Sequence, residues 1–145
     1  RLVEETKKEG AKVLCGGQRP ADFNKGYFYE PTIFDNVKDN FKIMTVEPFG
    51  PLSPITTFKS FDEVIERANN HSAGLAGYVC TNSMDLANKT SESLETGMVA
   101  VNTPFLSSAE TPFGGIKQSG YGREGGSLGI KDYLNVKYTH LGLSG

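Results

Sequence analysis

Residues 55–102 read ITTFKSFDEVIERANNHSAGLAGYVCTNSMDLANKTSESLETGMVAVN, in which short apolar runs alternate with helix-like segments. Three runs, residues 55–58, 76–81 and 98–102, have the length and apolar content of strands. The two segments between them carry helical patterns. Short helical crossovers join parallel strands through right-handed connections, so this stretch predicts a βαβαβ unit in an α/β fold.

Both helices of this unit carry signals for their ends. The first begins with Ser60-Phe61-Asp62-Glu63, the pattern of a capping box, in which serine and glutamate side chains cap free backbone N–H groups. Asn82-Ser83-Met84-Asp85 repeats this start signal, and Gly97 is well placed to end the second helix.

The chain before this unit is less regular. Residues 2–9 predict a helix that is closed by Gly10, and residues 11–15 predict a short strand. Residues 27–37 are rich in aromatic and β-branched side chains and predict an extended segment, in which Pro31 indicates an edge strand or a break.

The chain after Asn102 loses its regular pattern. A glycine-rich loop region extends to about Glu124, and loops of this length are usually functional. A short helical turn and a last strand, residues 132–143, follow. This strand alternates in part and has no evident partner within the chain, so its edge invites pairing with another chain.

Composition argues against several classes of protein. The 145 residues carry 15 basic and 17 acidic side chains for a net charge of -2, and the two signs are interspersed. Neither nucleic acid nor an anionic membrane is therefore expected as a partner, and no apolar run approaches the roughly 20 residues that span a bilayer. With 2 cysteines and 2 distant histidines, we expect neither a disulfide framework nor a metal site, and we expect a cytoplasmic protein.

Two motifs relate the chain to a known family. Residues 112–124 read PFGGIKQSGYGRE, a glycine-dense segment anchored by aromatic and charged side chains, and residues 46–51 read VEPFGP. With these motifs the chain resembles the C-terminal part of the NAD(P)-dependent aldehyde dehydrogenase superfamily along essentially its whole length. The resemblance implies a partial catalytic domain with a parallel βαβ sheet at residues 1–131. It also implies an oligomerisation strand at residues 132–145, through which identical subunits would associate.

Glu47 and Phe49 are the candidate cofactor-binding residues. Pro48 and Pro51 stiffen the backbone beside the Glu47 carboxylate, which suits it to accept two ribose hydroxyls, although an exposed loop carboxylate is the simpler interpretation. In the resembling family the matching segment contacts the nicotinamide ribose. The implied cofactor is NAD or NADP, bound mainly by segments absent from this chain.

A second glycine motif has a different interpretation. Residues 120–125 satisfy G-x-G-x-x-G, but no strand immediately precedes them and no acidic residue follows about 20 positions later, as a dinucleotide fingerprint requires. We therefore predict a tight turn that lets Arg123 or Glu124 bond to neighbouring backbone.

Ser107 and Phe113 are the candidate substrate-binding residues. Residues 103–111 match the stretch that lines the substrate tunnel in the family, and with residues 112–120 they most resemble succinate-semialdehyde dehydrogenases. The resemblance implies that Ser107 binds the distal carboxylate of succinic semialdehyde and that Phe113 walls the tunnel. The alternatives are an ordinary loop serine, a packing phenylalanine and a general aliphatic aldehyde as substrate.

No catalytic residue is assigned in this chain. Cys15 and Cys80 follow or end apolar strands, so we expect both to be small buried apolar side chains. The resemblance places the cysteine nucleophile and the general-base glutamate upstream of Arg1, which predicts that the chain alone is inactive. The alternative of another class is a non-catalytic assembly or binding module of the same fold.

Overall fold

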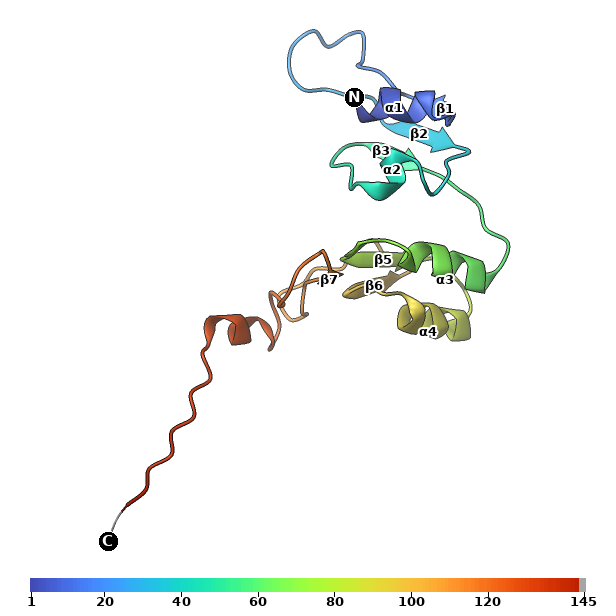
Figure 1. Ribbon diagram of the computed structural model, residues 1–145. Coiled ribbons are helices and arrows are strands. Elements are labelled where there is room, and N and C mark those ends of the chain that lie inside the picture. Colours follow the sequence, from blue (N-terminus) through green and yellow to red (C-terminus); the bar gives the residue numbers. More distant parts are fainter. Residues whose placement is uncertain (144–145) are drawn as a thin grey trace. The chain divides into compact units, whose positions relative to one another are not determined.

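The computed structural model describes residues 1–143, which divide into two compact units (Figure 1). The first unit is Arg1–Arg67, and the second begins at Ala68.

The first unit contains a three-stranded sheet. Its elements are α1 (Leu2–Lys8), β1 (Lys12–Cys15), β2 (Thr32–Asp35), α2 (Lys42–Thr45), β3 (Leu52–Pro54) and most of α3 (Phe61–Asn69). Strand β2 is central, antiparallel to β1 and parallel to β3. The predicted first helix and first strand are confirmed. Pro31 directly precedes β2 and so marks a break, and the alternative of an edge strand is wrong.

A small apolar core lies beneath this sheet. Phe34 of β2 is fully buried, and the buried apolar side chains around it are Val3, Ala11, Val37, Phe41 and Ile43. The buried Thr32 hydroxyl donates to the Glu30 carbonyl oxygen (2.8 Å) and accepts from the Gly17 N–H (2.8 Å). Because both hydrogen bonds are made, this polar group is buried without an unpaired atom.

The predicted capping box at the start of α3 is confirmed in part. The Glu63 N–H donates to the Ser60 hydroxyl (3.2 Å), as expected. The Glu63 carboxylate, however, accepts from the Lys59 N–H (2.9 Å), one residue earlier than the motif requires. The start of α3 therefore has both hydrogen bonds of a capping box, but the bond to the Glu63 carboxylate comes from a residue one position earlier than usual.

Arg67 joins α3 to two loops of the first unit. Its guanidinium donates to both Asp39 carboxylate oxygens (2.7 and 2.8 Å) and to Glu63 (3.0 Å). It also donates to the Thr57 carbonyl oxygen (2.7 Å) and to the Thr56 hydroxyl (3.0 Å). The bidentate pair is the geometry that a planar guanidinium makes best.

This cluster predicts a loss of stability in acid. The hydrogen bond from Arg67 lowers the pKa of Asp39, and the Lys59 N–H followed by Arg67 lowers the pKa of Glu63. A lowered folded-state pKa stabilises the fold above the unfolded value, and this contribution disappears as the pH falls through the folded value. Arg67→Met should therefore be less stable than the wild type at neutral pH, and the difference should shrink as the pH falls from about 4, the usual carboxyl value, through the lowered pKa values of Asp39 and Glu63.

Urea unfolding at several pH values measures this effect. Arg67→Lys keeps the charge but loses the bidentate geometry, so it should fall between the wild type and Arg67→Met. A constant difference between wild type and Arg67→Met from neutral to acidic pH would show that the carboxylates are not involved.

The second unit contains two pairs of strands. Its elements are β4 (Ala73–Gly74), β5 (Ala76–Val79), α4 (Met84–Ser93), β6 (Met98–Val101), β7 (Ile116–Lys117) and the 3-10 helix η1 (Gly129–Tyr133). Strands β5 and β6 are parallel and joined through α4, which lies beside them in Figure 1. Strands β4 and β7 are antiparallel. The α/β class and the parallel crossover are thus confirmed.

The strand predicted at residues 55–58 is wrong. The observed β3 lies a few residues earlier, at Leu52–Pro54, and pairs with β2 in the first unit. The sequence pattern identified apolar residues correctly but carries no information on which strand they pair with, since pairing is a tertiary contact.

The chain after η1 forms no strand within the described residues. Asp132 and Tyr133 belong to η1, which corrects the start of the strand predicted at 132–143. Residues 134–143 are exposed, and Figure 1 shows them as an extended segment. A strand needs a neighbour for its hydrogen bonds, and none of residues 1–143 pairs with this segment. Residues 144–145 of the expected tail lie outside the described residues.

Candidate functional site

A long loop of the second unit runs from the end of β6 to η1. Asn102 begins it in a left-handed conformation (φ 57°), which asparagine tolerates better than most residues. Its side chain accepts from the Thr81 N–H (2.9 Å) and donates to the Thr81 carbonyl oxygen (2.8 Å). The start of the loop is therefore tied to the chain that follows β5.

The loop folds back on itself, and its two arms, residues 113–115 and 122–124, meet at a β-bridge. The Phe113 N–H donates to the Glu124 carbonyl oxygen (2.7 Å), and the Glu124 N–H donates to the Phe113 carbonyl oxygen (2.8 Å). The backbone between them turns through two glycines with positive φ, Gly120 (104°) and Gly122 (79°).

The Arg123 side chain bonds to the backbone of both arms of the turn. Its Nη1 atom donates to the carbonyl oxygens of Gly115 (2.8 Å) and Gly122 (2.7 Å), which lie on the two arms. The prediction that residues 120–125 form a tight turn in which Arg123 bonds to neighbouring backbone is confirmed.

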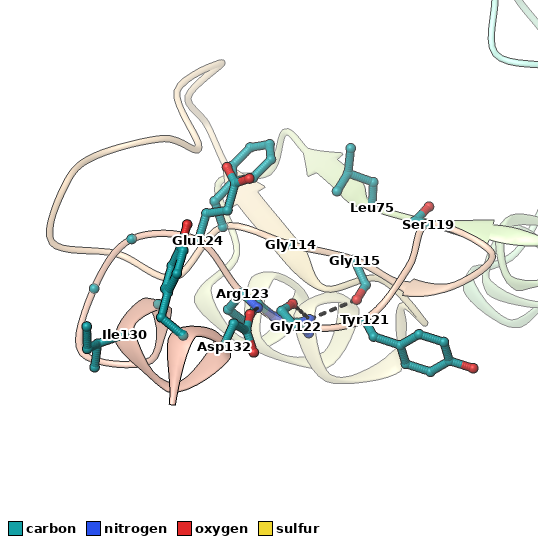
Figure 2. Close-up of a pocket in the computed structure, with 15 residues that line it drawn as sticks. Leu75, Gly114, Gly115, Ser119, Tyr121, Gly122, Arg123, Glu124, Ile130 and Asp132 are labelled. Carbon is teal, nitrogen blue, oxygen red and sulfur yellow. Dashed lines mark hydrogen bonds between the residues drawn. The ribbon is translucent and has the colours of Figure 1, made fainter. Parts of the chain in front are cut away.

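A pocket of about 860 Å³ lies between the arms and η1. Figure 2 shows the Arg123 and Asp132 side chains close together in this pocket, whereas the ring of Tyr121 points away from them. The Arg123 N–H donates to the Asp132 carboxylate (3.0 Å). The pocket wall is thus built from the charged side chains of Arg123 and Asp132, glycine backbone and the apolar side chains of Leu75 and Ile130.

Ser107 and Phe113 are brought together by the fold. Both line a pocket of about 290 Å³ beside Tyr78 and Met98, and both line a second one of about 410 Å³ beside Thr111. Phe113 is half-buried and also lines the pocket of Figure 2. The two residues therefore share a hollow between β5, β6 and the loop.

The two neighbouring serines differ in their hydrogen bonds. The Ser108 hydroxyl lies 3.2 Å from the Thr111 hydroxyl, and the Ser108 carbonyl oxygen accepts from that same hydroxyl (3.3 Å). The Ser107 hydroxyl makes no hydrogen bond within residues 1–143. Ser107 is thus the serine whose hydroxyl is available to a ligand.

Glu47 and Phe49 lie in the first unit, in the segment between α2 and β3. The segment is folded tightly, because the Gly50 N–H donates to the Pro48 carbonyl oxygen (2.8 Å). Glu47 is exposed and Phe49 is 94% exposed. The Glu47 carboxylate makes no hydrogen bond or ion pair in the described part of the chain, so both of its oxygens can accept. Glu47 and Phe49 thus belong to the first unit, whereas Ser107 and Phe113 belong to the second.

Comparison with known protein families shows which family this chain matches. The model of the aldehyde dehydrogenase family matches residues 1–139. The chain belongs to the aldehyde dehydrogenase family.

Relatives within the aldehyde dehydrogenase family share between two fifths and one half of the residues. Aldehyde dehydrogenase 1A1 from Mesocricetus auratus is 50% identical over 143 residues, which are 99% of this chain and 28% of that protein. The NAD+ complex of aldehyde dehydrogenase from Bacillus cereus is 46% identical with a TM-score of 0.89, over 93% of this chain and 27% of that one. Succinate-semialdehyde dehydrogenase from Burkholderia pseudomallei is 40% identical with a TM-score of 0.84, over 90% and 27%. The chain therefore spans under a third of the length of these relatives.

The two cysteines of this aldehyde dehydrogenase chain are exposed, which corrects their expected burial. Cys15 ends β1, an edge strand, and Cys80 follows the end of β5, so no described element covers either of them. The Cys15 thiol contacts the Pro31 carbonyl oxygen (3.7 Å), and neither thiol meets a base among the described residues. Activation of a thiol needs such a neighbour.

Sequence reasoning missed one polar cluster of the aldehyde dehydrogenase loop. The Lys117 ammonium donates to the Asn69 carbonyl oxygen (2.7 Å) and pairs with Glu95 (2.5 Å), while the Asn69 side chain bonds to Ser93 and Glu95 backbone (both 2.8 Å). This cluster joins β7 to the ends of α3 and α4. The feature of the sequence that could have indicated this cluster is Asn69, a residue with both donor and acceptor groups at the end of α3.

Two kinds of site are not found in the described residues of this aldehyde dehydrogenase chain. Residues 1–143 hold no group of three or more histidine, cysteine, aspartate or glutamate side chains that could hold a metal ion. Within the same residues, no helix has the length and apolar character needed to cross a membrane.

Proposed function

We propose that this chain is part of an NAD(P)-dependent aldehyde dehydrogenase that oxidises succinic semialdehyde to the carboxylic acid. The observation that carries the proposal is the unbonded Ser107 hydroxyl beside Phe113 in a shared hollow of the family's fold. A serine hydroxyl can donate to one oxygen of the substrate's distal carboxylate, a charge-assisted hydrogen bond, while the phenylalanine packs on the carbon chain. The likeness to the Burkholderia pseudomallei succinate-semialdehyde dehydrogenase supports the same substrate.

Glu47 and Phe49 fit the role of holding a nicotinamide nucleotide. The free carboxylate of Glu47 can accept hydrogen bonds from two ribose hydroxyls, and the exposed ring of Phe49 can pack beside them. When bound, NAD or NADP supplies the hydride acceptor of the reaction. The solved NAD+ complex of the Bacillus cereus relative supports a nicotinamide cofactor for this chain.

The catalytic thiol and the general base are proposed to be supplied outside this chain. A cysteine thiolate would attack the aldehyde carbon, and a glutamate would activate the water that releases the acid. Residues 1–143 would contribute binding groups, with Glu47 and Phe49 for the cofactor and Ser107 and Phe113 for the substrate. The 145-residue chain alone should accordingly form no reduced nicotinamide.

The exposed tail and the cytosolic relatives support a proposed association and location for this chain. Residues 134–143 are exposed and extended, which suits pairing with a second copy of the enzyme. A cytoplasmic enzyme is proposed from relatives such as aldehyde dehydrogenase, cytosolic 1 from Macroscelides proboscideus, which is 49% identical. We expect neither nucleic acid nor membrane partners.

A chimeric enzyme tests the proposed function. This chain would replace the aligned segment of the Bacillus cereus aldehyde dehydrogenase, and formation of reduced nicotinamide would be followed with succinic semialdehyde and with acetaldehyde, using NAD and then NADP. The ratio of kcat/KM for the two aldehydes should shift towards succinic semialdehyde by about tenfold relative to the unmodified enzyme. An active chimera with an unchanged ratio would contradict the proposed substrate.

Ser107→Ala in this chimera should raise the KM for succinic semialdehyde by about tenfold, the loss expected for one hydrogen bond to a charged group. Acetaldehyde has no distal carboxylate, so its KM should not change. Ser108→Ala is the matched control, because the Ser108 hydroxyl is bonded to Thr111 within the loop. Equal effects of both substitutions on both aldehydes would indicate a loop defect and no carboxylate contact.

Two alternatives have observations in their favour. The 50% identity to aldehyde dehydrogenase 1A1 favours a general aliphatic aldehyde, for which the chimera would show no preference for succinic semialdehyde. The exposed tail favours a non-catalytic assembly module, which should self-associate in a sizing column without any response to nicotinamide nucleotides.

A further inference from the structure

Asp132 is the side chain that joins η1 to the arm of the loop that pairs with Phe113. Its carboxylate accepts from the Arg123 N–H (3.0 Å), and it is the only η1 side chain among residues 1–143 that hydrogen bonds to this loop. The next residue, Glu124, makes both hydrogen bonds of the bridge to Phe113. The residue that Asp132 contacts is therefore adjacent in the chain to the residue that pairs with Phe113.

The groups around this contact lie close to one another. A Cβ atom at Gly122 would collide with the Asp132 carboxylate, and one at Gly114 would lie 2.7 Å from the Gly122 carbonyl oxygen and 2.8 Å from the Arg123 Cδ atom. The Asp132 carboxylate thus lies close to the turn at Gly122, and Gly122 in turn lies close to Gly114, which follows Phe113 in the chain. A change at the Asp132 carboxylate would therefore act first on the Arg123 N–H and then on Glu124, the next residue, which pairs with Phe113.

The charge of Asp132 suits this position. Its carboxylate receives a backbone N–H, while the Arg123 guanidinium bonds to Gly115 and Gly122 on either arm (Figure 2). A charged acceptor makes a stronger hydrogen bond to an N–H group than a neutral one does.

We propose that Asp132 is a positioning residue for the substrate site: through the Arg123 backbone it sets the place of the Phe113 wall. This inference rests on the proposed function, since it takes Phe113 as part of the substrate site. Asp132 lines neither of the two pockets that Ser107 and Phe113 share. Its loss should therefore weaken aldehyde binding and leave the chemical step nearly unchanged.

Amide hydrogen exchange of the 145-residue chain, followed by NMR, tests the local part of the proposal without any activity. In Asp132→Ala the amides of Phe113 and Glu124 should exchange about tenfold faster, which is the loss of one hydrogen bond to a charged group. The amides of Met98 and Asn102, which bond to the β5 strand region, should be unchanged. Asp132→Asn keeps an acceptor oxygen and should restore most of the protection.

Kinetics of the chimera test the functional part. Asp132→Ala should raise the KM for the best aldehyde of the chimera about fivefold to tenfold with kcat within about twofold, because one uniform binding contact is disturbed. Lys131→Ala is the control, since Lys131 lies on the same turn of η1 and its side chain makes no hydrogen bond or ion pair within residues 1–143. The choice of aldehyde is not critical, so this result stands even if the chimera prefers an aldehyde other than succinic semialdehyde.

Three results would overturn the proposal. Faster exchange throughout β5 and β6 in Asp132→Ala would show that Asp132 supports the fold in general. Unchanged exchange at Phe113 and Glu124, or a fall in kcat with an unchanged KM, would show that it does not place the Phe113 wall.

Discussion

Gly97→Ala should destabilise the second unit by about 3 kcal/mol, the upper end of the usual cost of overpacking. A Cβ atom at this position would collide with the Gly114 carbonyl oxygen and lie 2.8 Å from both the Gly114 carbonyl carbon and the Gly115 Cα atom. All of these are backbone atoms, so no side chain can rotate away. The collision also falls one residue before β6, where the Gly97 N–H donates to the Gly74 carbonyl oxygen (3.0 Å).

Urea unfolding followed by circular dichroism would measure this loss. Gly50→Ala is the matched control, because a Cβ atom there would meet nothing within 4 Å and its φ is not in the left-handed region. The control should change the free energy of unfolding by less than about 1 kcal/mol. A Gly97→Ala chain as stable as the control would mean that the Phe113 loop does not pack on the start of β6 in solution.

Glu47→Gln in the chimeric enzyme should lower kcat/KM for the nicotinamide nucleotide by about 30-fold, or about 2 kcal/mol. The carboxylate offers two acceptor oxygens to a pair of ribose hydroxyls, whereas the amide offers one oxygen and one donor nitrogen. Glu47 makes no hydrogen bond or ion pair in the described part of the chain, so the substitution should not change stability.

Glu66→Gln provides the comparison for this variant. Glu66 is an exposed carboxylate on α3 of the same unit and likewise has no hydrogen bond or ion pair within residues 1–143. It carries the same change of charge, so a general electrostatic effect would appear in both variants. Equal kcat/KM values for Glu47→Gln, Glu66→Gln and wild type would exclude Glu47 from the nucleotide site.

The elements that could be predicted are those whose signals act over a few residues. Ser83 was expected to start the second helix, and its hydroxyl accepts from the Leu86 N–H (3.2 Å) at the start of α4. Gly10 was expected to close the first helix, and it follows α1 with a φ of 103°. Such signals depend on steric limits and hydrogen bonds within one turn of chain, which the local sequence contains in full.

Predictions about burial and pairing succeeded less often. Cys15 and Cys80 have the apolar neighbours of buried residues, yet both lie at strand ends that no described element covers. Residues 134–143 have the partial alternation of a strand but no partner in the described chain. Burial and strand formation depend on what packs or pairs alongside, and a local pattern does not contain that information.

The amino-acid sequence alone was sufficient for the family, the α/β class and the starts of α3 and α4, because motifs, hydrophobic periodicity and capping residues are local. The prediction that Gly97 ends the second helix is wrong, since α4 ends at Ser93 and Gly97 directly precedes β6. It also indicated Ser107 and Phe113 as a pair. Tertiary folding was needed to show that Ser107 and not Ser108 has an unbonded hydroxyl, and that Asp132 reaches the Arg123 backbone across nine positions. These contacts exist because the glycine turn folds the loop back on itself, which places groups together that are distant along the chain.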